Sequence, residues 1–108
     1  MEIKNYEEAA LKTLNKELNK EEMLLNGLMG LNGEAGEAID LLKKHLFHGH
    51  ELNKEKLILE LGDIAWYLVE TCSALDISLE EVLKANIEKL EKRYSGEFSK
   101  EKSINRKI

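Results

Sequence analysis

Two pairs of acidic residues, each with a glycine between its members, are the part of this sequence best suited to chemistry. Glu34 with Glu37, and Glu60 with Asp63, both follow the pattern E-x-G-[ED]. Residues three positions apart on a helix differ in direction by about 60°, so each pair presents both carboxylates on one face. Two such helices packed side by side would bring all four carboxylates into one cleft.

Like-charge repulsion decides what such a cleft can hold. Two carboxylates about 6 Å apart cost roughly 3 kcal/mol at an effective dielectric of about 20, so four cannot all stay ionised and uncompensated. Either some retain protons or divalent cations neutralise the group. A ligand set of oxygens without histidine suits magnesium, with manganese as the alternative. A single acidic pair would be ordinary on a helix surface, but the repeat with its shared glycine predicts a metal site.

The composition favours a single all-α domain as the frame for these pairs. The 108 residues include no proline, and 43% of them are hydrophobic and 34% charged, which suits amphipathic helices. Apolar periodicity predicts four bundle-forming helices, over about residues 5–19, 21–47, 53–75 and 78–94. Their predicted caps are Gly49, Asn53 and a capping box from Ser78 to Glu81.

Glycines recur every third residue along the second helix, at positions 27, 30, 33 and 36. Each costs about 1 kcal/mol against alanine in a helix interior, so the run requires an explanation. One explanation is a loop around residues 31–33, and the other is close approach of a neighbouring helix. We expect Gly36 and Gly62 to let the second and third helices approach, and Gly27 and Gly30 to form a further face.

The third helix carries apolar residues around nearly its whole circumference, which predicts burial on most sides. Glu60 and Asp63 therefore border apolar surface and are more than a solvated face. Three neighbours from the same chain can hardly also cover Leu59 and Trp66, so we expect a homodimer or homotetramer. The single cysteine, Cys72, is expected to be a small buried hydrophobe.

Charge and hydropathy exclude several kinds of partner. A net charge of −5, from 21 acidic and 16 basic residues, leaves no broad basic surface, so no nucleic-acid polymer is expected as a partner. No apolar run approaches the length of a membrane span, and the first residues lack the features of a signal peptide. We therefore expect a soluble, cytoplasmic protein without a membrane partner.

At the acidic pairs the sequence resembles the MazG-like family of all-α NTP pyrophosphohydrolases. The family signature is an E-x-x-E pair followed on another helix by E-x-x-D, here with 22 residues between Glu37 and Glu60. The resemblance runs from about residue 31 to residue 99, about two-thirds of the chain, and includes a later N-x-x-K-L-x-x-R-Y segment ending at Tyr94. Ser95 stands where such proteins often carry proline, which weakens only the expected stop of the fourth helix.

The resemblance implies magnesium-dependent hydrolysis of a nucleoside or deoxynucleoside triphosphate to the monophosphate and pyrophosphate. In this interpretation the four acids hold the metal, and the substrate is bound by Asn86, Lys89, Arg93 and Tyr67. Dimers and tetramers are also typical of the family. The catalytic domain is expected over residues 1–98, followed by a mobile basic tail over residues 99–108.

Two other interpretations make different demands on the sequence. A ferritin-like di-iron bundle would need E-x-x-H motifs, but Asp40 and Trp66 stand where histidine is wanted. A non-catalytic helical dimerisation or adaptor module would pair its acids with lysine or arginine across an interface. Magnesium titration separates this alternative from the enzyme, because an adaptor should show no metal-dependent thermal shift.

Overall fold

The protein is described by a computed structural model, and the structure describes residues 1–94 and 100–105. It is all-α, as predicted, with no strand in these described ranges. The helices are α1 (Ile3–Leu11), α2 (Lys20–His48), α3 (Lys54–Ala74), α4 (Leu79–Tyr94) and the short α5 (Lys100–Ile104). No helix among the described residues is long and apolar enough to cross a membrane. The predicted stop of the fourth helix just beyond Tyr94 lies outside the described residues, whereas the structure describes residues 100–105 of the predicted tail, which include α5.

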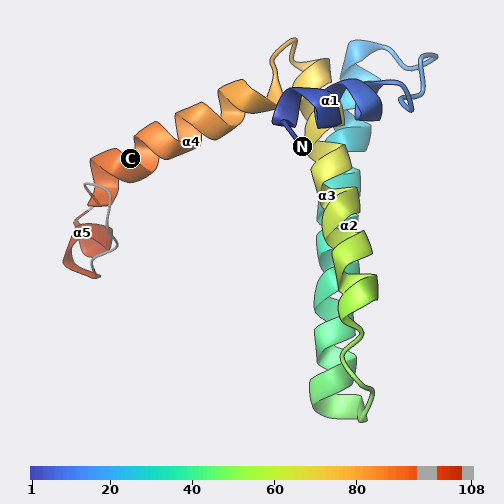
Figure 1. Ribbon diagram of the computed structural model, residues 1–108, viewed down its shortest axis with the longest axis vertical. Helices are drawn as coiled ribbons and strands as arrows, with labels where there is room; N and C mark the ends of the chain where they lie inside the picture. The colour runs from blue at the N-terminus through green and yellow to red at the C-terminus, as the bar shows by residue number, and fades with distance from the viewer. Residues whose placement is uncertain (95–99, 106–108) are drawn as a thin grey trace.

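Helices α2 and α3 form a long antiparallel hairpin, from which α4 leads away (Figure 1). Helix α2 is continuous over 29 residues, so the alternative of a loop around residues 31–33 is wrong. Its N-cap is Asn19, which exchanges hydrogen bonds with Glu22 in a capping box. Its C-cap is Gly49, whose φ of 73° is the left-handed conformation predicted from the sequence.

The caps of the next two helices also follow the sequence. The Asn53 side chain accepts a hydrogen bond from the Lys56 amide at the start of α3. Ser78 and Glu81 form the predicted capping box before α4. The first helix differs, because it ends at Leu11 instead of near residue 19. There the Thr13 hydroxyl donates to the Ala10 carbonyl at 2.7 Å, a local bond that competes with helix continuation.

Two glycines of α2 set how closely α3 approaches. A Cβ added at Gly27 would lie 3.1 Å and 3.2 Å from the backbone N and Cα of Thr71, and one added at Gly30 would overlap the Tyr67 ring. A Cβ at Gly36 or Gly62 would meet nothing within 4 Å. The expectation that Gly36 and Gly62 permit the approach is therefore wrong. Gly27 and Gly30 take that role, because they are the glycines that face α3.

The buried core lies at one end of the hairpin, where α1 and the start of α4 meet the C-terminal half of α3. It contains Ala10, Val69, Cys72 and Leu79, with Tyr6, Trp66 and Leu68 packed against it. Cys72 is buried, as predicted. The N-terminal half of α3 is different, because Leu59 is 69% exposed and Leu61 53% exposed. Within one chain, α3 is thus buried along only half its length, and not on most sides throughout.

Replacing Gly27 by alanine tests the close contact. The added methyl group would press on the backbone of α3, so Gly27→Ala should lower the free energy of unfolding by about 1–3 kcal/mol. Gly33→Ala is the matched control, because its Cβ meets open space. That variant should gain up to about 1 kcal/mol from helix propensity. Chemical denaturation measures both, and equal effects in the two variants would contradict the contact.

Candidate metal site

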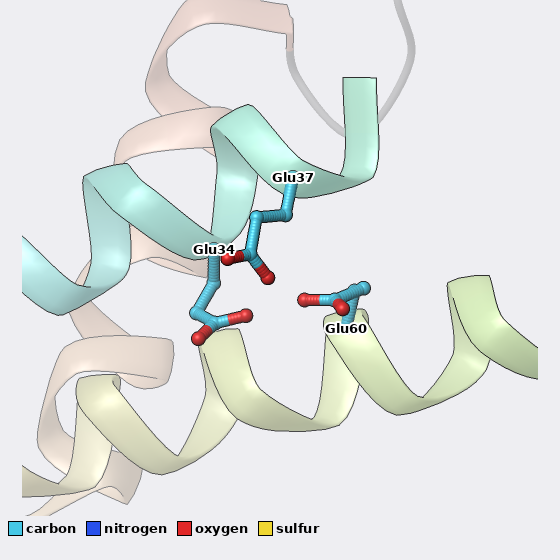
Figure 2. Close-up of side chains that lie close together, drawn as sticks. All are labelled: Glu34, Glu37 and Glu60. Carbon is cyan, nitrogen blue, oxygen red and sulfur yellow. The ribbon is translucent and has the colours of Figure 1, made fainter. Parts of the chain in front are cut away.

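Three carboxyl groups converge midway along the hairpin. Glu34 and Glu37 come from α2 and Glu60 from α3, and Figure 2 shows the three side chains pointing toward one another. One carboxylate oxygen from each lies within 4.8 Å of the others. This is the only group of at least three His, Cys, Asp or Glu side chains with such spacing among the described residues. Carboxylate oxygens gathered in this way are suited to a hard divalent cation.

The convergence follows from how the two helices are held together. Gly30, one turn before Glu34 on α2, lies against Tyr67 of α3. Further along, the Asn26 amide donates to both carboxylate oxygens of Glu70, at 2.8 Å and 3.1 Å. Glu70 is only 1% exposed, so this paired contact satisfies a carboxylate that would be costly to bury alone. These contacts fix the register that places Glu37 beside Glu60.

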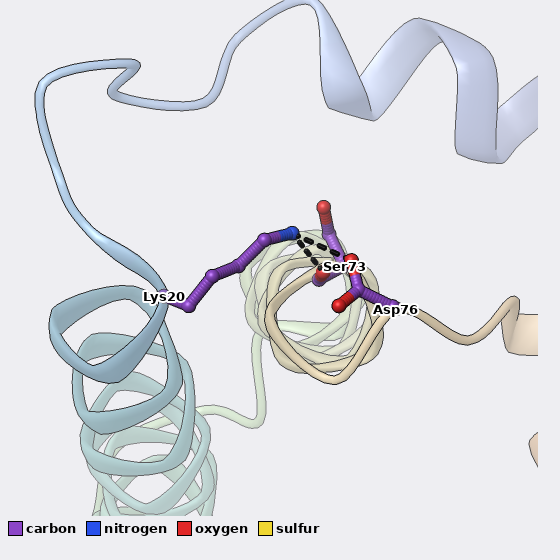
Figure 3. A network of polar contacts seen from close by, with 3 residues as sticks. All are labelled: Lys20, Ser73 and Asp76. Carbon is purple, nitrogen blue, oxygen red and sulfur yellow. Dashed lines mark hydrogen bonds and ion pairs between the residues drawn. The ribbon is translucent and has the colours of Figure 1, made fainter.

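A polar contact closes the end of the hairpin far from its turn. The Lys20 ammonium donates to the Ser73 carbonyl and pairs with Asp76, both at 2.9 Å (Figure 3). The positive charge therefore lies at the C-terminal end of α3, where the helix dipole is negative. Both charged side chains are well exposed, so the contact serves more to align the helix ends than to stabilise the fold.

The electrostatics of the three glutamates indicate an uncompensated site. The pKa of Glu37 is raised, first by a side-chain hydrogen bond with Glu60 and then by the charge of Glu60. The pKa of Glu60 is raised as well, first by a side-chain hydrogen bond with Glu34 and then by desolvation. One buried oxygen each of Glu34 and Glu60 has no hydrogen-bond partner among the residues that the structure describes. A cation bound between these groups would give the unpartnered oxygens a partner and would lower the raised pKa values. The residues therefore fit a metal.

Asp63, the fourth predicted ligand, lies outside this group of three. It is on α3, three residues beyond Glu60, and its side chain is exposed. Its charge nevertheless contributes to the raised pKa values of Glu37 and Glu60, so it belongs to the same electrostatic environment. Three of the four predicted carboxylates are thus brought together directly, and the fourth borders them.

The four predicted substrate-binding residues lie on two different helices, one on α3 and three on α4. Tyr67 lies against Gly30, and its ring makes an edge contact with Trp66 at 5.0 Å and 88°. Asn86, Lys89 and Arg93 are on α4, which contacts α1 and α3 but has no contact with α2 in the described part of the chain. One chain therefore does not bring these three residues to the glutamates.

Two residues near the carboxylates were not singled out from the sequence. Burial and then the charge of Asp63 raise the pKa of the Tyr6 hydroxyl, so α1 borders the site. No sequence pattern links Tyr6 to the acids. Lys56 lines the same groove as Glu37 and Glu60. It could have been found, because it precedes Glu60 by one helical turn and shares its face.

Comparison with known proteins gives consistent results. A family model described as the MazG nucleotide pyrophosphohydrolase domain matches residues 20–98, which includes all of α2, α3 and α4. The gene 37 protein of Mycobacterium phage L5 is 39% identical over 69 residues. That match covers 60% of this chain and 60% of the length of the phage protein. No solved structure matches the chain significantly.

The raised pKa values predict an unusual pH dependence of stability. Between the ordinary glutamate pKa of 4.5 and the raised values, the metal-free folded state binds more protons than the unfolded state. This contribution to the free energy of unfolding is therefore complete at low pH and is lost as pH rises through the raised pKa values. Glu37→Gln should flatten this decline, whereas Glu55→Gln, an exposed change of the same charge on α3, should not.

Denaturation at a series of pH values, with and without magnesium, measures the effect. Magnesium should remove most of the decline in wild-type protein, because the cation takes the place of the retained protons. Identical pH profiles for wild-type and Glu37→Gln protein would contradict the proposed coupling of the three glutamates.

Proposed function

The chain belongs to the MazG nucleotide pyrophosphohydrolase family, and we propose that it hydrolyses a nucleoside or deoxynucleoside triphosphate to the monophosphate and pyrophosphate. Magnesium would be held by Glu34, Glu37 and Glu60, with Asp63 completing the set. The observation that carries the proposal is the convergence of three carboxylates from two helices, two of them with unpartnered buried oxygens. Manganese, which takes the same oxygen ligands, is the alternative cation.

The reaction requires no nucleophilic side chain. The oxygen of a water molecule bonds to one phosphorus of the α–β linkage, and the bond from that phosphorus to the bridging oxygen breaks. The bridging oxygen keeps the electron pair, and the water gives up a proton. Magnesium held by these residues would neutralise the phosphate charges and lower the pKa of the attacking water. The glutamates would hold the cation and position this chemistry, and one of them could instead orient or deprotonate the water.

The remaining substrate contacts are proposed on the family resemblance. Tyr67 shares a helix face with Asp63 and would contact the ribose or base. Lys89, with Asn86 and Arg93 on the same helix, would bind phosphate oxygens, because cations paired with phosphate form strong hydrogen bonds. Asn86 and Lys89 are exposed, and α4 leads away from the hairpin of its own chain (Figure 1). These residues would therefore reach a site most directly in an assembly of several chains.

We also propose that the working unit is a homodimer or homotetramer. The radius of gyration is 16.9 Å, whereas a compact domain of this length has about 13 Å. Apolar side chains on three helices remain well exposed, including Leu28, Leu42 and Leu46 of α2, Ile58 and Leu61 of α3, and Leu83 and Ile87 of α4. Soluble monomers rarely leave so many neighbouring apolar side chains in water. A second copy would cover them and could line the nucleotide site.

Two charge-neutral variants test the metal site. Glu37→Gln and Asp63→Asn should abolish magnesium-dependent hydrolysis in a screen of nucleoside triphosphates with pyrophosphate detection, because each removes a ligand. Both should remain folded, since each also relieves like-charge repulsion. Glu55→Gln, at an exposed position in the first turn of α3, is the control and should keep wild-type activity. Near wild-type turnover in both test variants would rule out the site, and absence of any magnesium-dependent thermal shift would favour the adaptor.

Sedimentation at micromolar concentration tests the assembly. Wild-type protein should sediment as a dimer or tetramer of the 12.4 kDa chain. Ile87→Glu should shift it toward the monomer, because a charge would enter the apolar face of α4. Ala85→Glu places the same charge on another face of α4 and should leave the mass unchanged. A fully active species with the mass of one chain would contradict the proposal.

A further inference from the structure

A groove of about 670 Å³ runs along the hairpin beside the glutamates. Its volume lies within the range of small-molecule sites in proteins. Glu37 and Glu60 form part of its wall, together with Lys56 and the apolar side chains of Leu41 and Leu59. The groove therefore combines carboxylates, one lysine and apolar surface in a single space.

The floor of the groove is open because of two glycines. Gly33 and Gly36 both line it, and a Cβ added at either would meet nothing within 4 Å. Gly27 and Gly30 are in close contact with α3, whereas Gly33 and Gly36 are not. Their missing side chains leave room for a ligand next to the backbone of α2.

Lys56 is the lysine of this groove that no structural role explains. Lys44 pairs with Asp40 on α2 at 3.1 Å, so the other carboxylate of the groove wall is already compensated. Lys56 has no ion pair among the described residues, and its side chain is exposed. It also lies in the first turn of α3, where a positive charge opposes the helix dipole. The helix itself therefore gains nothing from a positive charge at this position.

The order of residues along α3 gives the site a direction, with Lys56 and Glu60 in the groove and with Asp63 and Tyr67 beyond its lining. Lys56, Glu60, Asp63 and Tyr67 follow one another at spacings of three or four residues, which places them on one face of the helix, about one turn apart. The carboxylates thus lie between a cation on one side and an aromatic ring on the other.

We propose that the two phosphates that leave as pyrophosphate bind in this groove at Lys56, and that the nucleoside lies on the other side of the carboxylates, beyond the groove and toward Tyr67. This inference rests on the proposed hydrolysis. The cleaved linkage must lie at the carboxylates, so the two products must lie on opposite sides of them. Pyrophosphate carries the greater charge and suits the lysine, which binds phosphate as a point charge. The sugar and base suit the aromatic side.

Calorimetric binding of inorganic pyrophosphate in the presence of magnesium tests the proposal without requiring turnover. Lys56→Ala should weaken pyrophosphate binding about tenfold, the loss expected for one hydrogen bond to a charged group. Binding of AMP, CMP, GMP and UMP should change by less than about twofold, since the monophosphate lies on the other side. Lys56→Arg should retain most pyrophosphate affinity. Lys54→Ala is the matched control, because it removes an exposed lysine from the same turn of α3.

Several outcomes would overturn the assignment. Unchanged pyrophosphate affinity in Lys56→Ala protein, with or without tighter magnesium binding, would show that Lys56 only offsets the glutamate charges. Equal losses for pyrophosphate and monophosphates would contradict the direction of the substrate, and so would failure of wild-type protein to bind pyrophosphate with magnesium. A wild-type protein that binds pyrophosphate through Lys56 but hydrolyses no triphosphate would refute the proposed hydrolysis and leave the pyrophosphate site standing.

Discussion

The close contact between α2 and α3 at Gly27 and Gly30 is the steric constraint on which the site depends. With no side chains at these two positions, α3 approaches until Thr71 and Tyr67 lie against the backbone of α2. This contact fixes which residues of the two helices lie opposite one another, and so it places Glu34 and Glu37 of α2 beside Glu60 of α3. The result is repulsion among Glu34, Glu37 and Glu60, which the fold accepts at a point where a cation can relieve it.

Features that depend on neighbouring residues in the sequence were predicted well. The caps at Gly49 and Asn53 and the capping box from Ser78 to Glu81 each involve a few consecutive residues, so their chemistry can be recognised without tertiary information. The helix face that both members of an acidic pair share could be predicted in the same way, because it follows from their spacing in the sequence. The repeated motif therefore indicated a carboxylate cluster, although periodicity alone could not show that Asp63 would lie outside the group of three.

Features that depend on the register between helices were predicted poorly. A helical wheel gives the direction of a side chain but not the residue it meets, so Gly36 and Gly62 were assigned the contact that Gly27 and Gly30 make. The early end of α1 has a local cause, because the Thr13 hydroxyl bonds to the Ala10 carbonyl while apolar periodicity continues past Leu11. The approach of Tyr6 to Asp63 depends on tertiary packing, because Tyr6 packs against the buried core and no local pattern marks that contact.

The two halves of the hairpin are stabilised by different means. At one end, α1 and the start of α4 bury Val69 and Cys72, and the Glu7 carboxylate accepts a hydrogen bond from the first amide of α4. The half that carries Glu37 and Glu60 has no such cover, since Leu59 and Ile58 are more than half exposed. Local stability should therefore be lowest beside the carboxylates. Ligands that bind only the folded state add their binding free energy to its stability, so a cation, a nucleotide or a second chain would each tighten this same half. Binding of the cation, the nucleotide or the second chain would then favour binding of the other two, because all three depend on the same two helices staying together.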